Sequence, residues 1–395
     1  YAGQSFSLNL IDLIKRWITD ASGNWEDAAN WSGGSVPTAI DSVAIDRGSA
    51  NPVVTLNSER AAQDLNLTET VRIVGGSLRL GGLNGGATRS GSVQLAGGNL
   101  TLSGPSALDQ LTQTSGSLTQ SGGSFNANSA SLSGGTASIS GAATIDSLTV
   151  SGNSAVTFGS TLASTNTETA GSLTATGAAT LANLTIAGGD AHLSGGLTST
   201  GTLNQTGGAL AIAGASTLNQ LTQSAGSLSQ SAGAFSAATA SLSGGTTNIS
   251  GAATINDLTV SGTAAATFGS TLTSANTVSV NAGNLTATGA ATLADLTITG
   301  GDTRLDGGLS STGTLSQTGG ALTIAGATTL NQLTQSAGSL SQSTGAAFAA
   351  SASLSGGTTG INGASTIDNL ALSGTSAVTF GSTFTSARTV TINAG

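Results

Sequence analysis

The chain contains no cysteine and no methionine, and it has few charged or aromatic residues. Without cysteine it can form neither a disulfide nor a thiolate nucleophile or metal ligand. Aromatic residues make up 3% and charged residues 7% of the 395 residues. A core of large side chains is thereby excluded, and we expect a thin core of small aliphatic residues. Methionine is absent even at position 1, so we expect that Tyr1 is not the translation start and that a leader segment has been removed.

Long apolar runs and positive charge are also scarce. No run of about 18 apolar residues occurs, so we expect no membrane-spanning helix. The net charge is −9, and seven of the nine basic residues lie at or before Arg89. This distribution leaves no basic track for a phosphate backbone, and we expect no nucleic-acid partner. The hydrophobic fraction of 37% argues against a disordered chain, although glycine alone supplies 59 residues.

What the chain does contain is a repeat. A glycine, a leucine or isoleucine four residues later, and a leucine three residues after that recur eight times. The step is about 37 residues, as from Gly104 to Gly141. A fixed period indicates one structural unit that is copied and stacked. The aliphatic anchors of the eight units are Leu108 and Leu111, Ile145 and Leu148, Leu181 and Leu184, Leu218 and Leu221, Ile255 and Leu258, Leu293 and Leu296, Leu330 and Leu333, and Ile367 and Leu370.

Short alternating segments between the anchors predict strands. SLTV and NLTI, for example, end at residues that form turns. A 37-residue unit fits two turns of about 18 residues, so the sequence predicts an all-β parallel β-solenoid. We expect the anchors to point inward and to stack into aliphatic ladders, and the repeated glycine to lie at a corner where a Cβ would clash or φ is positive. A longer repeat of three units is also present, because LTQTSGSLTQ after Leu108 returns as LTQSAGSLSQ after Leu218 and Leu330.

The first 40 residues differ from the rest and are predicted to cap the solenoid. Leu10, Leu13, Ile14 and Trp17 are spaced as on an amphipathic helix, so we expect a short helix here. The three tryptophans of the chain all fall in this segment, and Leu13, Trp17, Trp25 and Trp31 are the predicted cap residues. Residues 41–395 are predicted to form the solenoid, with irregular turns to about residue 89 and regular ones from about residue 90.

One part of the chain resembles a known family. Gly23, Trp25, Asp27, Asn30, Trp31 and Pro37, followed by VTL, LNL and GGSLRLGG, resemble the N-terminal signature of large secreted bacterial β-helix surface proteins. The repeats that follow are similar in texture to filamentous-haemagglutinin-like adhesins and autotransporter passengers. The resemblance implies a right-handed β-helix at a bacterial surface or outside the cell. It implies no catalytic or binding residue.

Candidate chemistry is sparse. His192 is the single histidine, and Arg304 replaces it in the next copy of the long repeat. Asp302 and Asp306 are the closest acidic pair, but Ser194 stands where a copy of Asp306 is expected. The GGD segments weakly resemble calcium-binding repeats, and the Asn, Asp or Gln between the anchors suits a corner that it hydrogen-bonds. We therefore assign no catalytic, cofactor or metal residue.

The expected function is structural. We expect a non-enzymatic extracellular β-solenoid that serves as a stiff stalk or filament of a bacterial surface, as an adhesin shaft or a fibre subunit. One alternative is a carbohydrate-binding or carbohydrate-cleaving β-helix. A second is an ice-binding solenoid, which would need threonines stacked turn on turn, and the Thr-x-Thr pairs at Thr174, Thr286 and Thr389 are too far apart for that.

The last residues suggest how the chain continues. TVTINAG at the C-terminus aligns with TVSVNAG at 277–283, so the chain stops within a long repeat without a modified closing unit. We expect either further repeats in a longer polypeptide or head-to-tail self-association. In the second case the alternating Phe6, Leu8 and Leu10 would supply the docking strand by β-augmentation.

Overall fold

The predicted fold class is confirmed. The computed structural model describes residues 14–85 and 90–393, and it is a parallel β-solenoid of about 18 turns with about 19 residues per turn. The chain divides into two compact units, Tyr1–Ser164 (unit 1) and Thr165–Gly395 (unit 2). Each unit is a stack of parallel strands.

The elements of the two units are short and almost all are strands. Unit 1 contains β1 (Ile14–Arg16), β2 (Gly23–Asn24), β3 (Ser42–Ile45), β4 (Val53–Leu56), β5 (Arg60–Leu67), β6 (Thr70–Ile73), β7 (Ser77–Asn84), β8 (Ser92–Leu102), β9 (Ser106–Gln120), β10 (Phe125–Leu132), β11 (Thr136–Ile139), β12 (Ala143–Val150) and β13 (Ala155–Phe158), with the 3-10 helices η1 (Ala28–Asn30), η2 (Ser32–Gly34) and η3 (Gly48–Ala50). The division between the units falls within β14 (Leu162–Thr169). Unit 2 contains β15 (Ser172–Ala175), β16 (Ala179–Ile186), β17 (Asp190–Leu193), β18 (Leu197–Gln205), β19 (Ala209–Ile212), β20 (Ser216–Gln223), β21 (Ser227–Gln230), β22 (Phe235–Leu242), β23 (Thr246–Ile249), β24 (Ala253–Val260), β25 (Ala265–Phe268), β26 (Leu272–Val280), β27 (Asn284–Ala287), β28 (Ala291–Ile298), β29 (Asp302–Leu305), β30 (Leu309–Gln317), β31 (Ala321–Ile324), β32 (Thr328–Gln335), β33 (Ser339–Gln342), β34 (Ala347–Leu354), β35 (Thr358–Ile361), β36 (Ser365–Leu372), β37 (Ala377–Phe380), β38 (Phe384–Thr385) and β39 (Thr389–Ile392).

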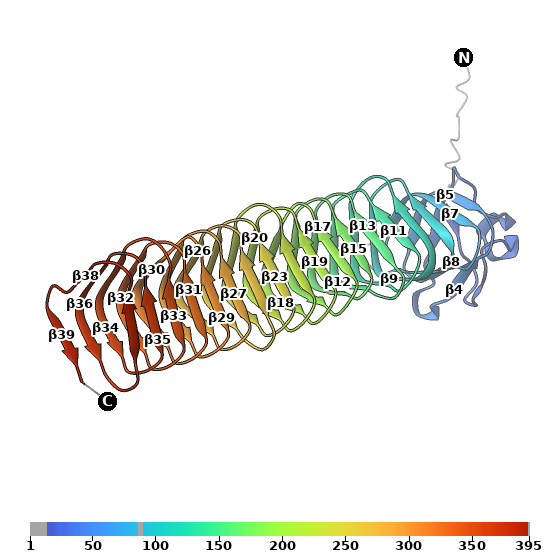
Figure 1. The fold of residues 1–395 in the computed structure, drawn as a ribbon. Coiled ribbons are helices and arrows are strands. Elements are labelled where there is room, and N and C mark those ends of the chain that lie inside the picture. The colour runs from blue at the N-terminus through green and yellow to red at the C-terminus, as the bar shows by residue number, and fades with distance from the viewer. Residues whose placement is uncertain (1–13, 86–89, 394–395) are drawn as a thin grey trace, which may run out of the picture. The chain divides into compact units, whose positions relative to one another are not determined.

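Each turn of unit 2 has three faces, made by one long and one short strand. Long strands pair in parallel with the long strands of the neighbouring turns, and short strands pair with short ones, as β30 with β32 and β31 with β33 (Figure 1). In β20 the buried positions are Ser216, Leu218, Leu221 and Gln223. This spacing shows that the strand bends between its two halves. The first half forms the first face, the second half the second face, and the short strand the third face.

The sixteen predicted anchors are all buried, with at most 4% of the residue surface exposed. The first anchors of successive units do not stack directly on one another, because each 37-residue unit makes two turns and the turn between two first anchors carries a smaller residue. Ala237 lies between Leu218 and Ile255, and Ser311 lies between Leu293 and Leu330. Large and small residues thus alternate in the column of the first anchors, and the prediction of a continuous aliphatic ladder is wrong there. The second anchors do form such a ladder, because consecutive turns place in register Leu184, Leu203, Leu221, Ala240 and Leu258.

A second inward-facing column of the first face lies two residues before the first anchors. Large and small residues alternate in it as well, but in the opposite order. Ser216, Phe235, Ala253, Leu272, Ala291 and Leu309 follow one another from turn to turn. A large residue in one column thus accompanies a small one in the other within each of these turns. Strands about 4.8 Å apart cannot hold two large side chains at every position, and the opposed phases fill the interior evenly.

The third copy of the long repeat breaks this pattern at one position. Phe125 and Phe235 fill the first buried position of β10 and β22, but Ala347 holds that position in β34 and the phenylalanine is displaced to Phe348. Phe348 faces outward and is 41% exposed. A cavity of about 20 Å³ remains beside Ala347, lined by side chains that include Leu330 and Ile367.

Restoring the pattern should stabilise the protein. In the double variant Ala347→Phe with Phe348→Ser, the new phenyl group should fill the cavity and remove an exposed apolar side chain. We expect the free energy of unfolding to rise by about 1 kcal/mol, measured by urea denaturation. The single variant Phe348→Ser serves as the control and should change stability little. A double variant less stable than this control would show that β34 is packed too closely to accept a phenyl group.

The predicted corner role of the repeated glycines has a definite cause. A Cβ on Gly141, Gly251 or Gly363 would lie within 1.8 Å of a backbone carbonyl oxygen of the preceding turn. None of these three glycines has a positive φ. The neighbouring turn therefore occupies the space of the side chain, and close approach, not backbone conformation, requires glycine here.

Two glycines near the C-terminus allow a matched test. A Cβ on Gly363 would be 1.7 Å from the oxygen of Gly345, whereas a Cβ on Gly360 would meet nothing within 4 Å. We expect Gly363→Ala to destabilise the protein by about 2 to 3 kcal/mol, since the two turns must separate. Gly360→Ala should leave stability unchanged or raise it by about 0.5 kcal/mol. Equal effects in thermal denaturation would contradict the packing of these turns.

The core also contains glutamines, which the expectation of an aliphatic interior missed. Gln113, Gln120, Gln205, Gln223, Gln230, Gln317, Gln335 and Gln342 are at most 1% exposed. Gln223 donates from Nε2 to the oxygen of Thr246 at 3.0 Å, and its Oε1 accepts from the hydroxyl of Thr247. Gln230 donates from Nε2 to the oxygens of Ala232 and Ala234, at 3.0 and 3.1 Å. These side chains stabilise the corners from the interior. Their amides donate to backbone carbonyl groups that would otherwise be buried without a hydrogen-bond donor.

The helix expected near Trp17 is wrong where the structure describes it. Residues Ile14–Arg16 form strand β1, which pairs in parallel with β3 so that Ile14 lies beside Ser42 and Arg16 beside Ala44. The pairing with a complete neighbouring strand outweighs the helical spacing, since strand hydrogen bonds here are available from the first solenoid turn. Leu10 and Leu13 lie outside the described residues.

Candidate functional site

The three tryptophans form one packed cluster. Trp17, Trp25 and Trp31 are at most 1% exposed. The ring of Trp31 meets that of Trp17 edge to face at 5.2 Å between centroids and that of Trp25 at 4.8 Å. Trp31 donates from Nε1 to the oxygen of Trp25 at 2.7 Å. The cluster is therefore an interior, and its rings offer no exposed platform for a ligand.

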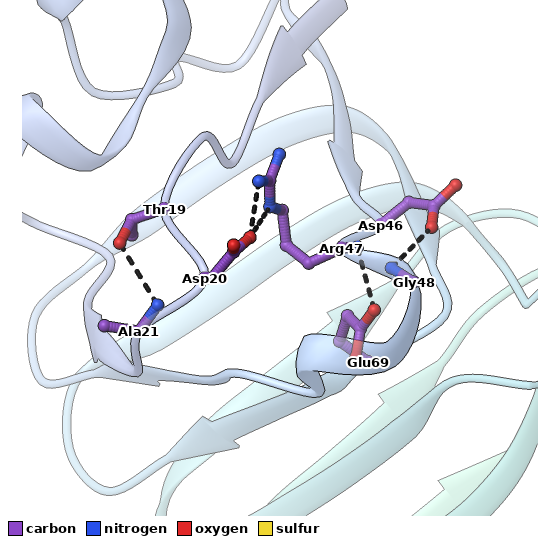
Figure 2. Close-up of polar contacts among 7 residues, drawn as sticks. All are labelled: Thr19, Asp20, Ala21, Asp46, Arg47, Gly48 and Glu69. Atoms are coloured by element: carbon purple, nitrogen blue, oxygen red, sulfur yellow. Dashed lines mark hydrogen bonds and ion pairs between the residues drawn. The ribbon is translucent and has the colours of Figure 1, made fainter.

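Three charged residues of the first turns, Asp20, Arg47 and Glu69, are linked by hydrogen bonds and are called the polar clasp. Arg47 bonds to the carboxylate of Asp20 through Nε at 2.9 Å, and its backbone N–H donates to Glu69 Oε1 at 2.8 Å (Figure 2). Figure 2 also shows Asp46 accepting from the N–H of Gly48, at 3.4 Å. The clasp joins the N-terminal segment, the loop after β3 and the turn after β5. No group of three or more acidic or histidine side chains in the described ranges could hold a metal ion.

The carboxylate of Glu26 also holds the N-terminal segment against the next turn. One oxygen of Glu26 accepts bonds of 2.9 Å from the N–H groups of Asn57 and Ser58 and from the Ser58 hydroxyl. Burial raises the pKa of Glu26, but the hydrogen bonds from Asn57 and Ser58 outweigh it, so the pKa lies below its ordinary value. A lowered pKa in the folded state means that this carboxylate stabilises the fold above the unfolded pKa. The contribution is lost as pH falls through the folded pKa.

The lowered pKa of Glu26 predicts how the stability of the variant Glu26→Gln depends on pH. The variant should be less stable than the parent protein at neutral pH, and the difference should shrink once the pH falls below about 4. Urea denaturation at several pH values measures it. Glu59→Gln is the control, because Glu59 is exposed and its ion pair with Arg79 is long, at 3.7 Å. A difference that stays constant as the pH falls would contradict the role of the ionised carboxylate.

The candidate catalytic residues are not brought together. His192 lies on the third face of β17 and is exposed, with Thr174 and Ala211 beside it in the neighbouring turns. Arg304 Nε bonds to Asp306 Oδ1 at 2.8 Å, which engages one member of the acidic pair. Asp302 has Asn284 and Ala321 as its register neighbours. This arrangement provides neither a paired acid and base nor a histidine oriented by a carboxylate.

The polar residues between the anchors bond to the adjoining turn. Asp295 accepts from the N–H of Thr314 at 2.7 Å, and Asn183 accepts from that of Thr202 at 3.1 Å. Asp257 accepts from the amide of Asn276 at 2.9 Å. These bonds lie where the long strand bends between two faces, so the residues support the corner.

Threonines do stack turn on turn, contrary to the expectation from the Thr-x-Thr pairs. One outward column on the first face of unit 2 holds Thr180, Thr198, Thr217, Ser236, Thr254, Thr273, Thr292, Ser310 and Thr329 in unbroken register. All but Ser236 are exposed. The column two residues further along is irregular, since Thr200, Asn219 and Ala238 occupy it. The face therefore carries one regular line of hydroxyl groups.

Unit 1 carries a groove on its surface. It has a volume of about 530 Å³ and crosses strands β3, β5, β7 and β9 on the first face. Asn66, Asn84 and Asn126 lie in one outward column, with Ala107 between the last two. Asp64 stands in the adjacent column between Ser42 and Gly82. Leu65 and Leu83 also line the groove, but their side chains are buried on the inner side of the strands.

The depth of the groove comes from missing side chains. A Cβ on Gly82 would lie 3.2 Å from Asp64 Oδ1 and 3.4 Å from the oxygen of Pro105, so a larger residue would fill the space between them. Sequence reasoning missed this site, because the residues come from irregular turns. A signal was present nevertheless, since Asn66 and Asn84 are 18 residues apart, which is one turn.

Comparison with protein-family models, with curated proteins and with solved structures found no match. Within the described residues no helix is long and apolar enough to cross a membrane.

Proposed function

We propose that the protein is a non-enzymatic structural β-solenoid that forms a stiff shaft on a bacterial surface, as an adhesin stalk or a fibre subunit. The observation that carries this proposal is the continuous pairing in unit 2. From β16 to β36 every long strand pairs in parallel with the next, and the interior is filled by the opposed columns. At about 4.8 Å per turn these strands span on the order of 50 Å.

Such a stack resists bending. A bend must stretch the hydrogen bonds on one face and compress side chains on another, and the close-packed columns leave little room for either. The eight copies of the 37-residue unit also show that duplicating a unit lengthens the solenoid without changing how its turns pack. Length and stiffness are the properties that a shaft requires.

The surface location rests on the N-terminal signature. The signature residues Gly23, Trp25, Asp27 and Trp31 resemble those of secreted bacterial β-helix proteins. In the structure Asp27 caps η1 by accepting from the N–H of Ala29 at 3.0 Å, and the tryptophans build the adjoining cluster. These residues organise the first turn, which is the role that an N-terminal signature of a solenoid needs.

Immunogold labelling of intact cells that make the protein tests the location. We expect label on unpermeabilised cells, at a distance from the membrane, because a shaft projects outward. A strain in which the gene is deleted controls for antibody specificity. Label that appears only after permeabilisation would contradict the proposal.

The last turns support self-association or continuation as part of the same proposal. Val390 and Ile392 in β39 are 46% and 68% exposed, and the rings of Phe380 and Phe384 stack at 4.4 Å between centroids. Either further repeats of a longer polypeptide or the N-terminal part of a neighbouring copy would cover these side chains. The proposed docking residues Phe6, Leu8 and Leu10 lie outside the described residues.

Electron microscopy of the purified chain separates assembly from isolated molecules. Fibres with an axial repeat near one chain length support head-to-tail assembly. For a longer polypeptide, the full-length protein should show rods that extend beyond one chain length. Dispersed particles of one chain length from the full-length protein would contradict both forms of the proposal.

The threonine column favours ice binding as a second candidate function. Hydroxyl and methyl groups repeated about every 4.8 Å on a flat exposed face can order water molecules. Thermal hysteresis of the purified protein tests this candidate, with Thr254→Lys as the disrupting variant and Thr267→Lys, on the third face, as the control. Absence of hysteresis in the parent protein would refute it.

A further inference from the structure

We propose that an exposed site around Phe348 in unit 2 binds a neutral saccharide. Phe348 is 41% exposed, and in the described part of unit 2 the other exposed large apolar side chains, Val390 and Ile392, belong to β39. The ring contributes little to the packing of the turns, because it points away from the interior. This inference does not rest on the shaft proposal, since a shaft needs only the packing of its turns.

The ring interrupts the line of hydroxyl groups on the first face. Thr329 precedes Phe348 in this register and Thr366 follows it, one turn away on each side. Thr329 is exposed and Thr366 is half-buried. An exposed aromatic ring offers an apolar surface to the C–H groups on one side of a pyranose. Hydroxyls of the same sugar then face the polar groups beside the ring.

These polar groups lie at the adjoining corner, two residues further along each strand. In four successive turns the corner position holds Asn331, Ala350, Asp368 and Arg388. Ala350 belongs to the strand of Phe348, and its methyl group leaves a gap between the two polar side chains on either side. Asn331 and Asp368 are two turns apart, on the order of 10 Å between Cα atoms. This gap suits one pyranose ring.

The corner side chains select for hydroxyls. The amide of Asn331 donates and accepts, the carboxylate of Asp368 accepts, and the guanidinium of Arg388 donates. Within the described residues these three side chains form no hydrogen bond or ion pair, so they are available to a ligand. A sugar hydroxyl both donates and accepts, and neighbouring hydroxyls of one ring can therefore bond to two of these groups together.

The second copy of the long repeat shows that this corner is recessed. There Asn219 and Ala238, two of the equivalent corner residues, help to line a hollow of about 460 Å³ whose other residues include Ser236. Ligand pockets occupy about 300 to 1,000 Å³. In the third copy Phe348 takes the place of Ser236 in the register. The third copy therefore adds an aromatic ring beside a corner of this kind.

Charge and backbone pairing disfavour other ligands. Asp368 and Arg388 lie in neighbouring turns and their charges balance, so an anionic ligand or a phosphate backbone gains little net attraction. Strand β34 pairs with β32 on one side and with β36 on the other. An extended peptide therefore finds no strand edge to join. A neutral polyhydroxylated ligand remains the best chemical match.

Saturation-transfer NMR of the full chain tests the proposal. The probes are methyl glycosides and short linear oligosaccharides of glucose, galactose, mannose and N-acetylglucosamine. We expect transfer to the ring protons of at least one probe, and the affinity for it is then measured by calorimetry. Phe348→Ala should weaken this affinity at least about tenfold, because the apolar surface that contacts the sugar is lost.

A double variant separates loss of the site from loss of the fold. Ala347→Phe with Phe348→Ser moves the ring into the interior, beside the cavity of about 20 Å³. This variant should lose binding although its melting temperature is at least that of the parent protein. Binding that survives in it would overturn the proposal.

Two amide variants complete the test. Asn331→Ala should weaken binding about fivefold, since one hydrogen-bonding group is lost. Asn219→Ala is the matched control and should bind as the parent does, because it removes the equivalent exposed amide of the second copy, where Ser236 stands in place of the ring. Equal affinity of the parent, Phe348→Ala and Asn331→Ala would overturn the proposal. So would a failure of every probe to bind.

Discussion

Replacing Leu221 by aspartate should lower the free energy of unfolding by at least about 4 kcal/mol. Leu221 is 1% exposed and lies between Leu203 and Ala240 in the second-face column. A carboxylate at this position has no basic residue among its register neighbours, so it must enter the interior unpaired or become protonated at a high energetic cost. The turns on both sides should loosen as well, because each turn is stabilised mainly by its neighbours.

Urea denaturation followed by circular dichroism measures this change. Thr217→Asp is the matched control, because Thr217 lies on the same strand, faces outward and is exposed. Its effect should stay within about 0.5 kcal/mol. Similar losses in the two variants would mean that β20 does not present Leu221 to the interior.

Truncating Phe235 to alanine should cost about 3 to 5 kcal/mol. The ring is 1% exposed and lies between two small residues, Ser216 and Ala253, of the neighbouring turns. Neither neighbour can fill the space that the ring leaves, so a cavity forms. The natural chain already shows this outcome in the next copy, where Ala347 stands in the same position beside a cavity.

The displaced phenylalanine supplies the control for this variant. Phe348→Ala removes the same side chain from an outward position in β34, and we expect a change of at most about 1 kcal/mol. Thermal denaturation of both variants gives the comparison. If Phe348→Ala costs as much as Phe235→Ala, the opposed columns do not determine the stability of unit 2.

The 37-residue period made the solenoid fold predictable, but it did not reveal how the residues of neighbouring turns pack on one another. The anchor spacing predicted which residues of β20 and β24 face inward, because their identity hardly varies along the chain. Aligning the sequence by its 37-residue unit compares only every second turn, however. Aligned at 18 or 19 residues, Leu218 falls on Ala237 and Thr217 on Ser236, and both the alternation and the threonine column become visible.

The features that could not be predicted depend on contacts between distant residues. The spacing of Ile14 and Trp17 fits a helix, and only the presence of Ser42 to Ala44 alongside makes Ile14–Arg16 a strand. Gln223 stands where related turns have valine or isoleucine, and nothing local shows that its amide can reach Thr246. The groove arises from an absence at Gly82, which has no sequence signature of its own.

The stacking of one 19-residue turn on the next is the central claim, and a pair of introduced cysteines tests it most directly. The chain has no cysteine of its own, so Thr217→Cys with Ser236→Cys gives a single candidate disulfide. These positions are register neighbours, about 4.8 Å apart, which is within the range of about 4.4 to 6.8 Å that a disulfide spans between Cα atoms. Thr217→Cys with Thr254→Cys places the thiols two turns apart, beyond that range. We predict that mild oxidation closes the first pair within one chain and leaves the second pair reduced. Closure of the second pair in preference to the first would show one 37-residue turn per repeat and would contradict the account.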